Sequence, residues 1–151
     1  MTPSPACIKL IEGFETCAKA MGEGVFAAYM PTPQDRPTIG WGSTGPDIAM
    51  GLTWTQAECD VRFATDLAKF ATGVSAAITG ETAQNQFDAM VSLAYNIGLG
   101  AFKASTLLRL HNAGDFTGAD AQFAVWNKQA GKVLPGLVRR RATEAAMYRG
   151  G

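Results

Sequence analysis

The sequence has few of the residues that form disulfides or metal sites. Its 151 residues include three cysteines and one histidine, and none of the cysteines has a C-x-x-C spacing. Cys7 and Cys17 fall on one predicted helix, where ten residues span about 15 Å, beyond the reach of a disulfide. We therefore expect reduced thiols, no metal site and no cofactor.

Long apolar runs and an excess of one charge are also missing. No run approaches the roughly 18 residues that span a bilayer, and the start, Met-Thr-Pro-Ser-Pro, is not a basic segment followed by an apolar one. Basic and acidic side chains number 13 each, which argues against a dedicated nucleic-acid binder. We expect synthesis in a reducing cytosol, no stable membrane insertion and no nucleic-acid partner.

The charge is unevenly distributed along the chain. Residues 1–75 carry 5 basic and 8 acidic side chains, whereas residues 76–151 carry 8 and 5. A basic C-terminal half could approach an anionic polymer, although ordinary scatter explains the difference equally well.

Hydrophobic spacing predicts a mainly α (α+β) chain. Apolar residues recur with helical period over residues 5–21, and a capping-box pattern at Thr53 and Gln56 begins a long helix over about 54–72. Apolar stretches at 25–29 and 38–41 predict a small antiparallel hairpin within a Gly- and Pro-rich region of about 22–52. Further predicted elements are helices at 82–97, 104–113, 116–127 and 137–148, and a loop at 128–136. We expect one domain over residues 1–151, in which the long helix joins a small β-hairpin lobe to a larger helical bundle across a cleft.

Residues 40–45, Gly-Trp-Gly-Ser-Thr-Gly, have the form G-x-G-x-x-G. A dinucleotide site requires a helix that opens at these glycines, but Pro46 follows them and the next predicted helix begins near residue 54. We therefore interpret the glycines as a tight turn beneath a ligand or another stretch of backbone.

Carboxylates in the first part of the chain are candidate catalytic acids. On the first predicted helix, Glu15 lies about 80° from the centre of the apolar stripe, whereas Glu12 lies about 140° away. Partial removal from water favours the neutral form that a general acid needs, but a surface Glu in an ion pair also suits the position of Glu15. Asp35 and Thr38 could together hold a water molecule, and Asp35 equally suits a turn residue between two prolines.

The C-terminal half offers weaker candidates. His111 has no partnered Ser or Cys, which argues against a hydrolase triad, and we expect it at the surface or at a helix cap. The consecutive residues Arg139, Arg140 and Arg141 fan around roughly 200° of a helix. They cannot all face one anionic ligand, so at least one should form a structural ion pair.

Four segments together resemble the phage-type lysozymes, glycoside hydrolase family 24. They follow the order of that family and span almost the whole chain. The segments are Leu10-Ile11-Glu12-Gly13-Phe14-Glu15; Ala28-Tyr29 followed by T-I-G-W-G-S-T at 38–44; F-D-A-M-V-S-L-A-Y-N-I-G at 87–98; and the C-terminal set S-T-L-L at 105–108, N-A-G-D at 112–115, Trp126 and P-G-L-V-R-R-R-A-T-E at 135–144.

The resemblance implies a lysozyme-like two-lobe fold and a muramidase that cleaves the β-1,4 bond between N-acetylmuramic acid and N-acetylglucosamine in peptidoglycan. It gives Glu15 the role of general acid and Thr38 that of placing the attacking water. It also implies that Tyr95 and Asn96 contact the glycan strand.

Two departures from the family pattern bear on the site. Pro31 stands where the family places its Asp, and Asp35 is the nearby carboxylate that could replace it. Glu23 lies fifteen residues before Thr38, the family's usual interval between Glu and Thr, and is a rival acid. We favour Glu15 because it has the helical context.

The resemblance further implies a cofactor-free, monomeric endolysin that lyses the host cell. It would accumulate in the host cytoplasm and reach the periplasm and wall through a lesion made by a separate holin. Two alternatives stay open. One is a non-catalytic or weakly catalytic peptidoglycan-binding module, suggested by Pro31, and the other is a virion-associated lysozyme used in entry.

Overall fold

The computed structural model describes residues 1–15, 20–22, 24–31 and 36–150. Cys17, Glu23 and Asp35 lie outside the described residues. The chain divides into two compact units, which we call the β unit (Ile11–Ala68) and the helical unit (Met1–Leu10 with Lys69–Gly151). The described chain is mainly helical with a small sheet, as the sequence predicts. That it folds as one domain stays a prediction.

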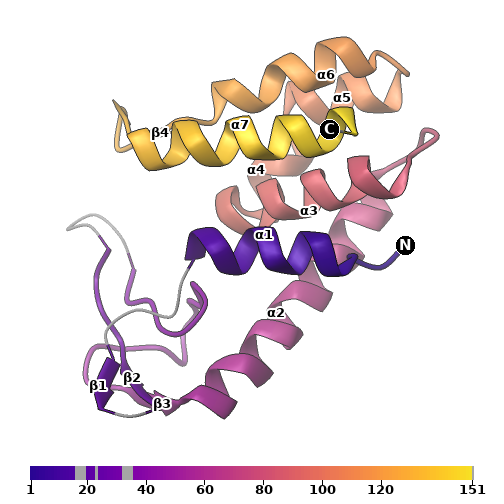
Figure 1. Ribbon diagram of the computed structural model, residues 1–151. Coiled ribbons are helices and arrows are strands. Elements are labelled where there is room, and N and C mark those ends of the chain that lie inside the picture. Colours follow the sequence, from indigo (N-terminus) through magenta and orange to yellow (C-terminus); the bar gives the residue numbers. More distant parts are fainter. Residues whose placement is uncertain (16–19, 23, 32–35, 151) are drawn as a thin grey trace. The chain divides into compact units, whose positions relative to one another are not determined.

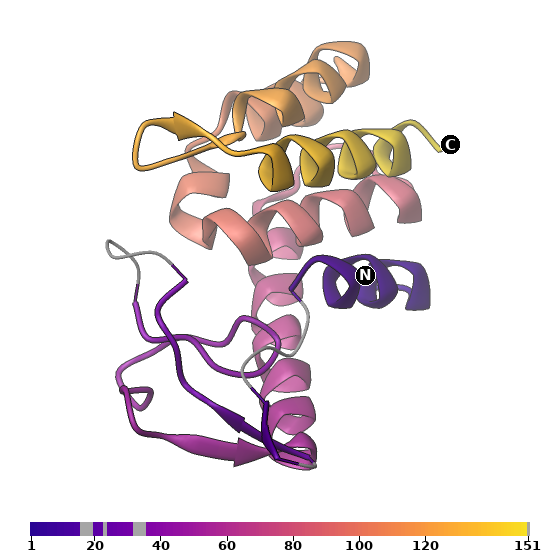
Figure 2. The ribbon, with the colours of Figure 1, turned by 60° about the vertical axis from the view of Figure 1, so that its left-hand side comes forward.

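The helical unit is built around α3 (Gln84–Ile97), whose residues from Phe87 to Ala94 are all buried. Helix α7 (Pro135–Arg149) packs along it, and the two helices run side by side in both views (Figures 1 and 2). The remaining elements of this unit are the start of α1 (Pro5–Glu15), the end of α2 (Gln56–Ala77), α4 (Leu99–Lys103), α5 (Thr106–Asn112), α6 (Phe116–Gln122) and the 3-10 turn η1 (Phe123–Val125).

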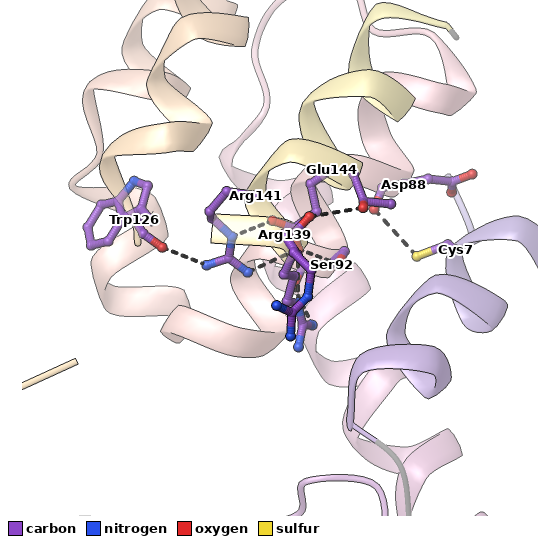
Figure 3. A network of polar contacts seen from close by, with 9 residues as sticks. Cys7, Asp88, Ser92, Trp126, Arg139, Arg141 and Glu144 are labelled. Carbon is purple, nitrogen blue, oxygen red and sulfur yellow. Dashed lines mark hydrogen bonds and ion pairs between the residues drawn. The ribbon is translucent and has the colours of Figure 1, made fainter. Parts of the chain in front are cut away.

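A buried ion-pair network joins α7 to α3 (Figure 3). Arg140, Arg141 and Glu144 of α7 are all buried. Glu144 Oε2 accepts hydrogen bonds from Arg140 Nε and Arg141 Nη2, each at 3.2 Å, and Glu144 Oε1 forms an ion pair with Arg141 Nε at 2.7 Å. Ser92 Oγ of α3 donates to Glu144 Oε2 at 2.5 Å, and Arg141 Nη1 donates to the Trp126 carbonyl at 3.3 Å. The prediction that at least one of the consecutive arginines is structural is confirmed for two of them.

The β unit contains a three-stranded antiparallel sheet. Its strands are β1 (Ala20–Gly22), β2 (Val25–Ala27) and β3 (Thr53–Thr55), and β2 is the central one. Beside the sheet, Ala28, Ile39 and Ile48 form a buried apolar cluster against which Leu52 and Trp54 pack. The unit also contains the end of α1 and the first part of α2, which continues into the helical unit.

This sheet corrects two predictions. The first helix was expected over 5–21, but α1 ends at Glu15, and residues 20–22 form a strand because their backbone groups pair with β2. The predicted hairpin of 25–29 with 38–41 is wrong for the most part, since β2 pairs with β1 and β3. Thr38 meets Tyr29 in a single bridge. The chain then turns back on itself between Ile39 and Ser43, with Gly40 and Gly42 at φ of 65° and 88°, so it cannot continue as a strand.

The start of α2 lies two residues beyond the predicted cap. Thr53 belongs to β3, and the capping box is made by Thr55 and Glu58. The amide of Glu58 donates to Thr55 Oγ1 at 3.2 Å, and the amide of Thr55 donates to Glu58 Oε1 at 3.0 Å.

In the C-terminal half, the helix expected over 104–113 is confirmed as α5, although the short α4 before it was not predicted. The loop predicted at 128–136 contains a small hairpin of β4 (Lys128–Gln129) and β5 (Lys132–Val133), which precedes α7 (Figure 2). Among the described residues, no helix combines the length and apolar character needed to cross a membrane.

The expectation that His111 is a surface or cap residue is wrong, because its side chain is 0% exposed. Nε2 lies 2.7 Å from Thr82 Oγ1, and Nδ1 lies 2.6 Å from the Tyr148 hydroxyl. The Thr82 hydroxyl donates to the Gly80 carbonyl at 3.1 Å, so it accepts from Nε2–H, and Nδ1 accepts from Tyr148. His111 follows the buried Leu107 by four residues, and this spacing could have predicted its inward position.

Burial makes the stability of the protein depend on His111 at mildly acidic pH. Desolvation lowers the pKa of His111 below its usual value of 6.5, so the unfolded chain takes up this proton first as the pH falls. The contribution of His111 to the free energy of unfolding is fully present above about pH 6.5. Below that pH it decreases by at most about 1.4 kcal/mol per pH unit. Urea unfolding at a series of pH values between 7.5 and 5 should show this slope in the wild type and a smaller one in His111→Gln. Equal slopes would contradict the assignment.

Candidate active site

Glu15 is the last residue of α1, and its side chain is half-buried, as the helical spacing predicts. Glu12, which was expected to be solvated, is half-buried as well, so exposure does not distinguish the two residues. They differ in the neighbour that the Glu15 carboxyl meets on the 39–43 turn.

The carboxyl of Glu15 lies directly against Gly42. A Cβ at Gly42 would come within 2.3 Å of Glu15 Oε2 and 2.9 Å of its Cδ, far inside van der Waals contact. The carboxyl therefore occupies the space that any other side chain at this position would fill. Gly42 also has φ of 88°, a left-handed backbone that favours glycine, and a side chain there would displace the end of the Glu15 side chain.

The turn that carries Gly42 is closed by backbone hydrogen bonds between Ile39 and Ser43, at 3.0 and 2.9 Å. Its other glycine, Gly40, lies against α2, since a Cβ there would be 3.1 Å from Cys59 Cβ. The segment is a tight turn in close contact with neighbouring groups, and no helix opens at its glycines. This confirms the interpretation of the motif as a turn.

Thr38 precedes this turn and is held firmly. Its side chain is 6% exposed, and its backbone exchanges two hydrogen bonds with Tyr29, at 2.9 and 2.8 Å. Thr38 Oγ1 donates to the Arg36 carbonyl at 3.0 Å, which uses its proton and leaves acceptor capacity on the oxygen. Pro31, where the resemblance places the family's Asp, is exposed.

Tyr95 and Asn96 lie near the end of α3 and belong to the helical unit. The ring of Tyr95 is half-buried and packs on Phe70, with 5.2 Å between ring centroids, while Asn96 is exposed. The structure therefore brings together Glu15 and the turn that follows Thr38 within one unit. The roles of these residues stay predictions.

Residues of α2 that sequence analysis missed also contact the turn. Trp41 Nε1 donates to Asp60 Oδ1 at 2.8 Å, and Ser43 Oγ donates to Asp66 Oδ2 at 2.8 Å. The sequence contains one signal that concerns Asp66, its i, i+4 spacing from Arg62, which predicts an ion pair along the helix. This spacing does not predict that Asp66 also contacts the turn.

The chemistry of the site is that of oxygen acids. Within the ranges that the structure describes, no three His, Cys, Asp or Glu side chains gather as a metal site. The half-buried carboxyl of Glu15 lies on the 39–43 turn, and the buried Thr38 directly precedes this turn. A carboxyl in such a position suits proton transfer to a bound substrate.

Comparison with known proteins gives a consistent result. Residues 20–144 match the family described as phage lysozyme, a range that begins after Glu15 and includes Glu23 and Thr38. The endolysin of Bacillus phage PZA is 41% identical over 152 aligned residues, which cover 100% of this chain and 56% of that protein. The chain thus spans little more than half the length of this relative.

Two solved structures match over nearly their full length. The endolysin from Escherichia coli O157:H7 phage FAHEc1 is 34% identical with a TM-score of 0.81, and the match covers 98% of this chain and 93% of that one. The muramidase domain of SpmX from Asticaccaulis excentricus is 33% identical with a TM-score of 0.80, covering 96% and 95%. Both matches confirm the expected lysozyme-like class of fold.

The contact between Glu15 and Gly42 can be tested by stability alone. Gly42→Ala should lose about 1–2 kcal/mol for its left-handed backbone and a further, smaller amount because the Glu15 carboxyl must move away. Gly51→Ala is the matched control, because Gly51 has φ of 96° and nothing within 4 Å of its Cβ position. In a Glu15→Ala background the extra cost of Gly42→Ala should disappear in urea unfolding. An unchanged cost in that background would show that the two groups do not touch.

Proposed function

The chain belongs to the phage lysozyme family, and on that basis we propose that it is a muramidase. Its substrate is the β-1,4 bond between N-acetylmuramic acid and N-acetylglucosamine in peptidoglycan. The observation that carries the proposal is the half-buried carboxyl of Glu15 lying on Gly42. This contact supports the proposal because it brings a candidate acid against the T-I-G-W-G segment.

Glu15 acts as the general acid. A Glu15 oxygen gives its proton to the bridging oxygen as the bond from that oxygen to the anomeric carbon of N-acetylmuramic acid breaks. N-acetylglucosamine leaves as an alcohol, and the remaining sugar ring becomes oxocarbenium-like. Contact with Gly42 supports this role, because positioning of the proton donor is a large part of the rate enhancement.

Thr38 and Asp35 handle the attacking water. The hydroxyl of Thr38 donates to Arg36, so it is suited to accept a hydrogen bond from the water and orient its lone pair. Asp35, which takes the place of the family's Asp, accepts the proton that this water loses. After this step Glu15 is ionised and Asp35 is protonated. Proton exchange with solvent then returns both carboxyl groups to their starting states.

The glycan strand is also bound by Tyr95 and Asn96. The exposed amide of Asn96 offers a donor and an acceptor to sugar hydroxyl and acetamido groups. Phe70 supports the ring of Tyr95, which limits the entropy lost on binding.

In its biological setting the protein is an endolysin that acts as a monomer. It accumulates in the host cytoplasm and reaches the wall after a separate holin opens the membrane. The name of the 41% identical relative, an endolysin, supports this use. The alternative, a wall-binding module without catalysis, is favoured by one observation, the Pro31 at the position of the family's Asp.

Glu15→Gln should lower the rate of clearing of permeabilised bacterial cells by about 10²–10⁴-fold, because glutamine cannot donate the proton. Glu23→Gln is the matched control and should keep the wild-type rate. A dead Glu23 variant with an active Glu15 variant would transfer the acid role to Glu23. Wild-type protein that binds walls and releases no new reducing ends would establish the binding module instead.

Asp35→Asn should slow the same reaction by about 10²-fold or more, since the water then lacks its proton acceptor. Sedimentation with purified walls should show unchanged binding, because the carboxylate acts on the water. A wild-type rate would remove Asp35 from the mechanism and leave Thr38 alone to place the water.

A further inference from the structure

Asp66 of α2 is the hub of the contacts that fix the turn beneath Glu15. Its side chain is 18% exposed, and both of its oxygens are in use. Oδ2 accepts from Ser43 Oγ at 2.8 Å, and Oδ1 accepts from Arg62 Nε at 2.9 Å. Arg62 in turn donates from Nη2 to the Thr44 carbonyl at 3.0 Å. One carboxylate thereby holds two consecutive residues of the chain that follows Gly42.

The bond from Ser43 to Asp66 is part-buried, whereas the bonds that Trp41 and Arg62 make at the turn are exposed. Ser43 is 1% exposed, so without Asp66 its hydroxyl would be buried without this acceptor. It follows Gly42 directly, and any movement of Ser43 moves the surface on which the Glu15 carboxyl lies. By contrast, the bond from Trp41 to Asp60 is exposed and weakened by solvent.

We propose that Asp66 is a positioning residue for catalysis, which holds Glu15 in place through Ser43 and Gly42 without touching the substrate. This inference rests on the proposed function, because the placement of Glu15 affects a rate only if Glu15 is the acid. A misplacement of about 1 Å at a reacting group can cost about 10²-fold in rate. Loss of Asp66 therefore acts on turnover and leaves glycan binding intact.

Asp66→Asn and Asp47→Asn form a matched pair of variants. Each removes one carboxylate charge from Arg62, but Asp47 contacts the outer Nη1 at 2.6 Å, and its side chain is 59% exposed. In the Asp66→Asn variant the new amide has a single acceptor oxygen to serve Ser43 and Arg62 together. Both variants are assayed on solubilised peptidoglycan well below their unfolding midpoints, so that only folded protein is compared.

We expect Asp66→Asn to lower kcat by about 10-fold or more with KM unchanged, and to move the pH limb of kcat that reports the acid. Asp47→Asn should keep the wild-type kcat, KM and pH profile. Ser43→Ala should reproduce the loss in kcat, and the double variant should be no worse than either single one, because both break the same link.

The outcomes separate this inference from the proposed function. An active wild type, a dead Glu15→Gln variant and a wild-type kcat in Asp66→Asn would overturn the positioning role alone. The positioning role would also be overturned if the loss of kcat in Asp66→Asn equalled the fraction of unfolded protein in the assay. It would likewise be overturned if the losses of kcat in Asp66→Asn and Ser43→Ala added in the variant that combines them. An inactive wild type would overturn the proposed function and this inference together.

Discussion

The backbone of the 39–43 turn is the constraint that places Glu15 and α2 side by side with the chain after Thr38. Gly42 has φ of 88°, which favours glycine, and the carboxyl of Glu15 lies where a side chain at this position would extend. The left-handed backbone at Gly42 allows the chain to double back, and the return brings Ser43 to Ile39 and to α2. The end of α1, the 39–43 turn and the side of α2 therefore meet at this turn, α1 through the Glu15 carboxyl and α2 through Asp66.

The two units use their charges differently. In the helical unit Arg140, Arg141 and Glu144 are buried together, so their side chains join α7 to α3 and cannot contact a ligand at the surface. Basic side chains that can make direct contact with an anion are exposed ones such as Lys128, Lys132 and Arg139. In the β unit the carboxylates of α2 are instead hydrogen-bonded to the turn, where they act on position.

The sequence predicts well what depends on local periodicity. The helical spacing of α1 places Glu15 at the edge of its apolar face, and the glycines of 40–45 indicate a turn. Prediction fails where distant segments compete with a local pattern. Pairing with β2 turns residues 20–22 into a strand, β3 takes up the threonine expected to cap α2, and His111 finds partners on α7 and beside α3. The hub at Asp66 has no local signature, because Ser43 reaches it from across the unit.

Pro31, where the resemblance places the family's Asp, belongs to a segment whose two ends are joined by a backbone bridge. Tyr29 and Thr38 exchange two backbone hydrogen bonds, so the chain leaves and re-enters at the same point. Position 31 lies two residues from this bridge on one arm, and position 35 lies three residues from it on the other. At about 3.3–3.6 Å per residue, position 31 stays within roughly 7 Å of the bridge. Between the two bridge residues the sequence still has one carboxylate, Asp35, so the loss of an acidic residue at position 31 does not remove every acid from this segment.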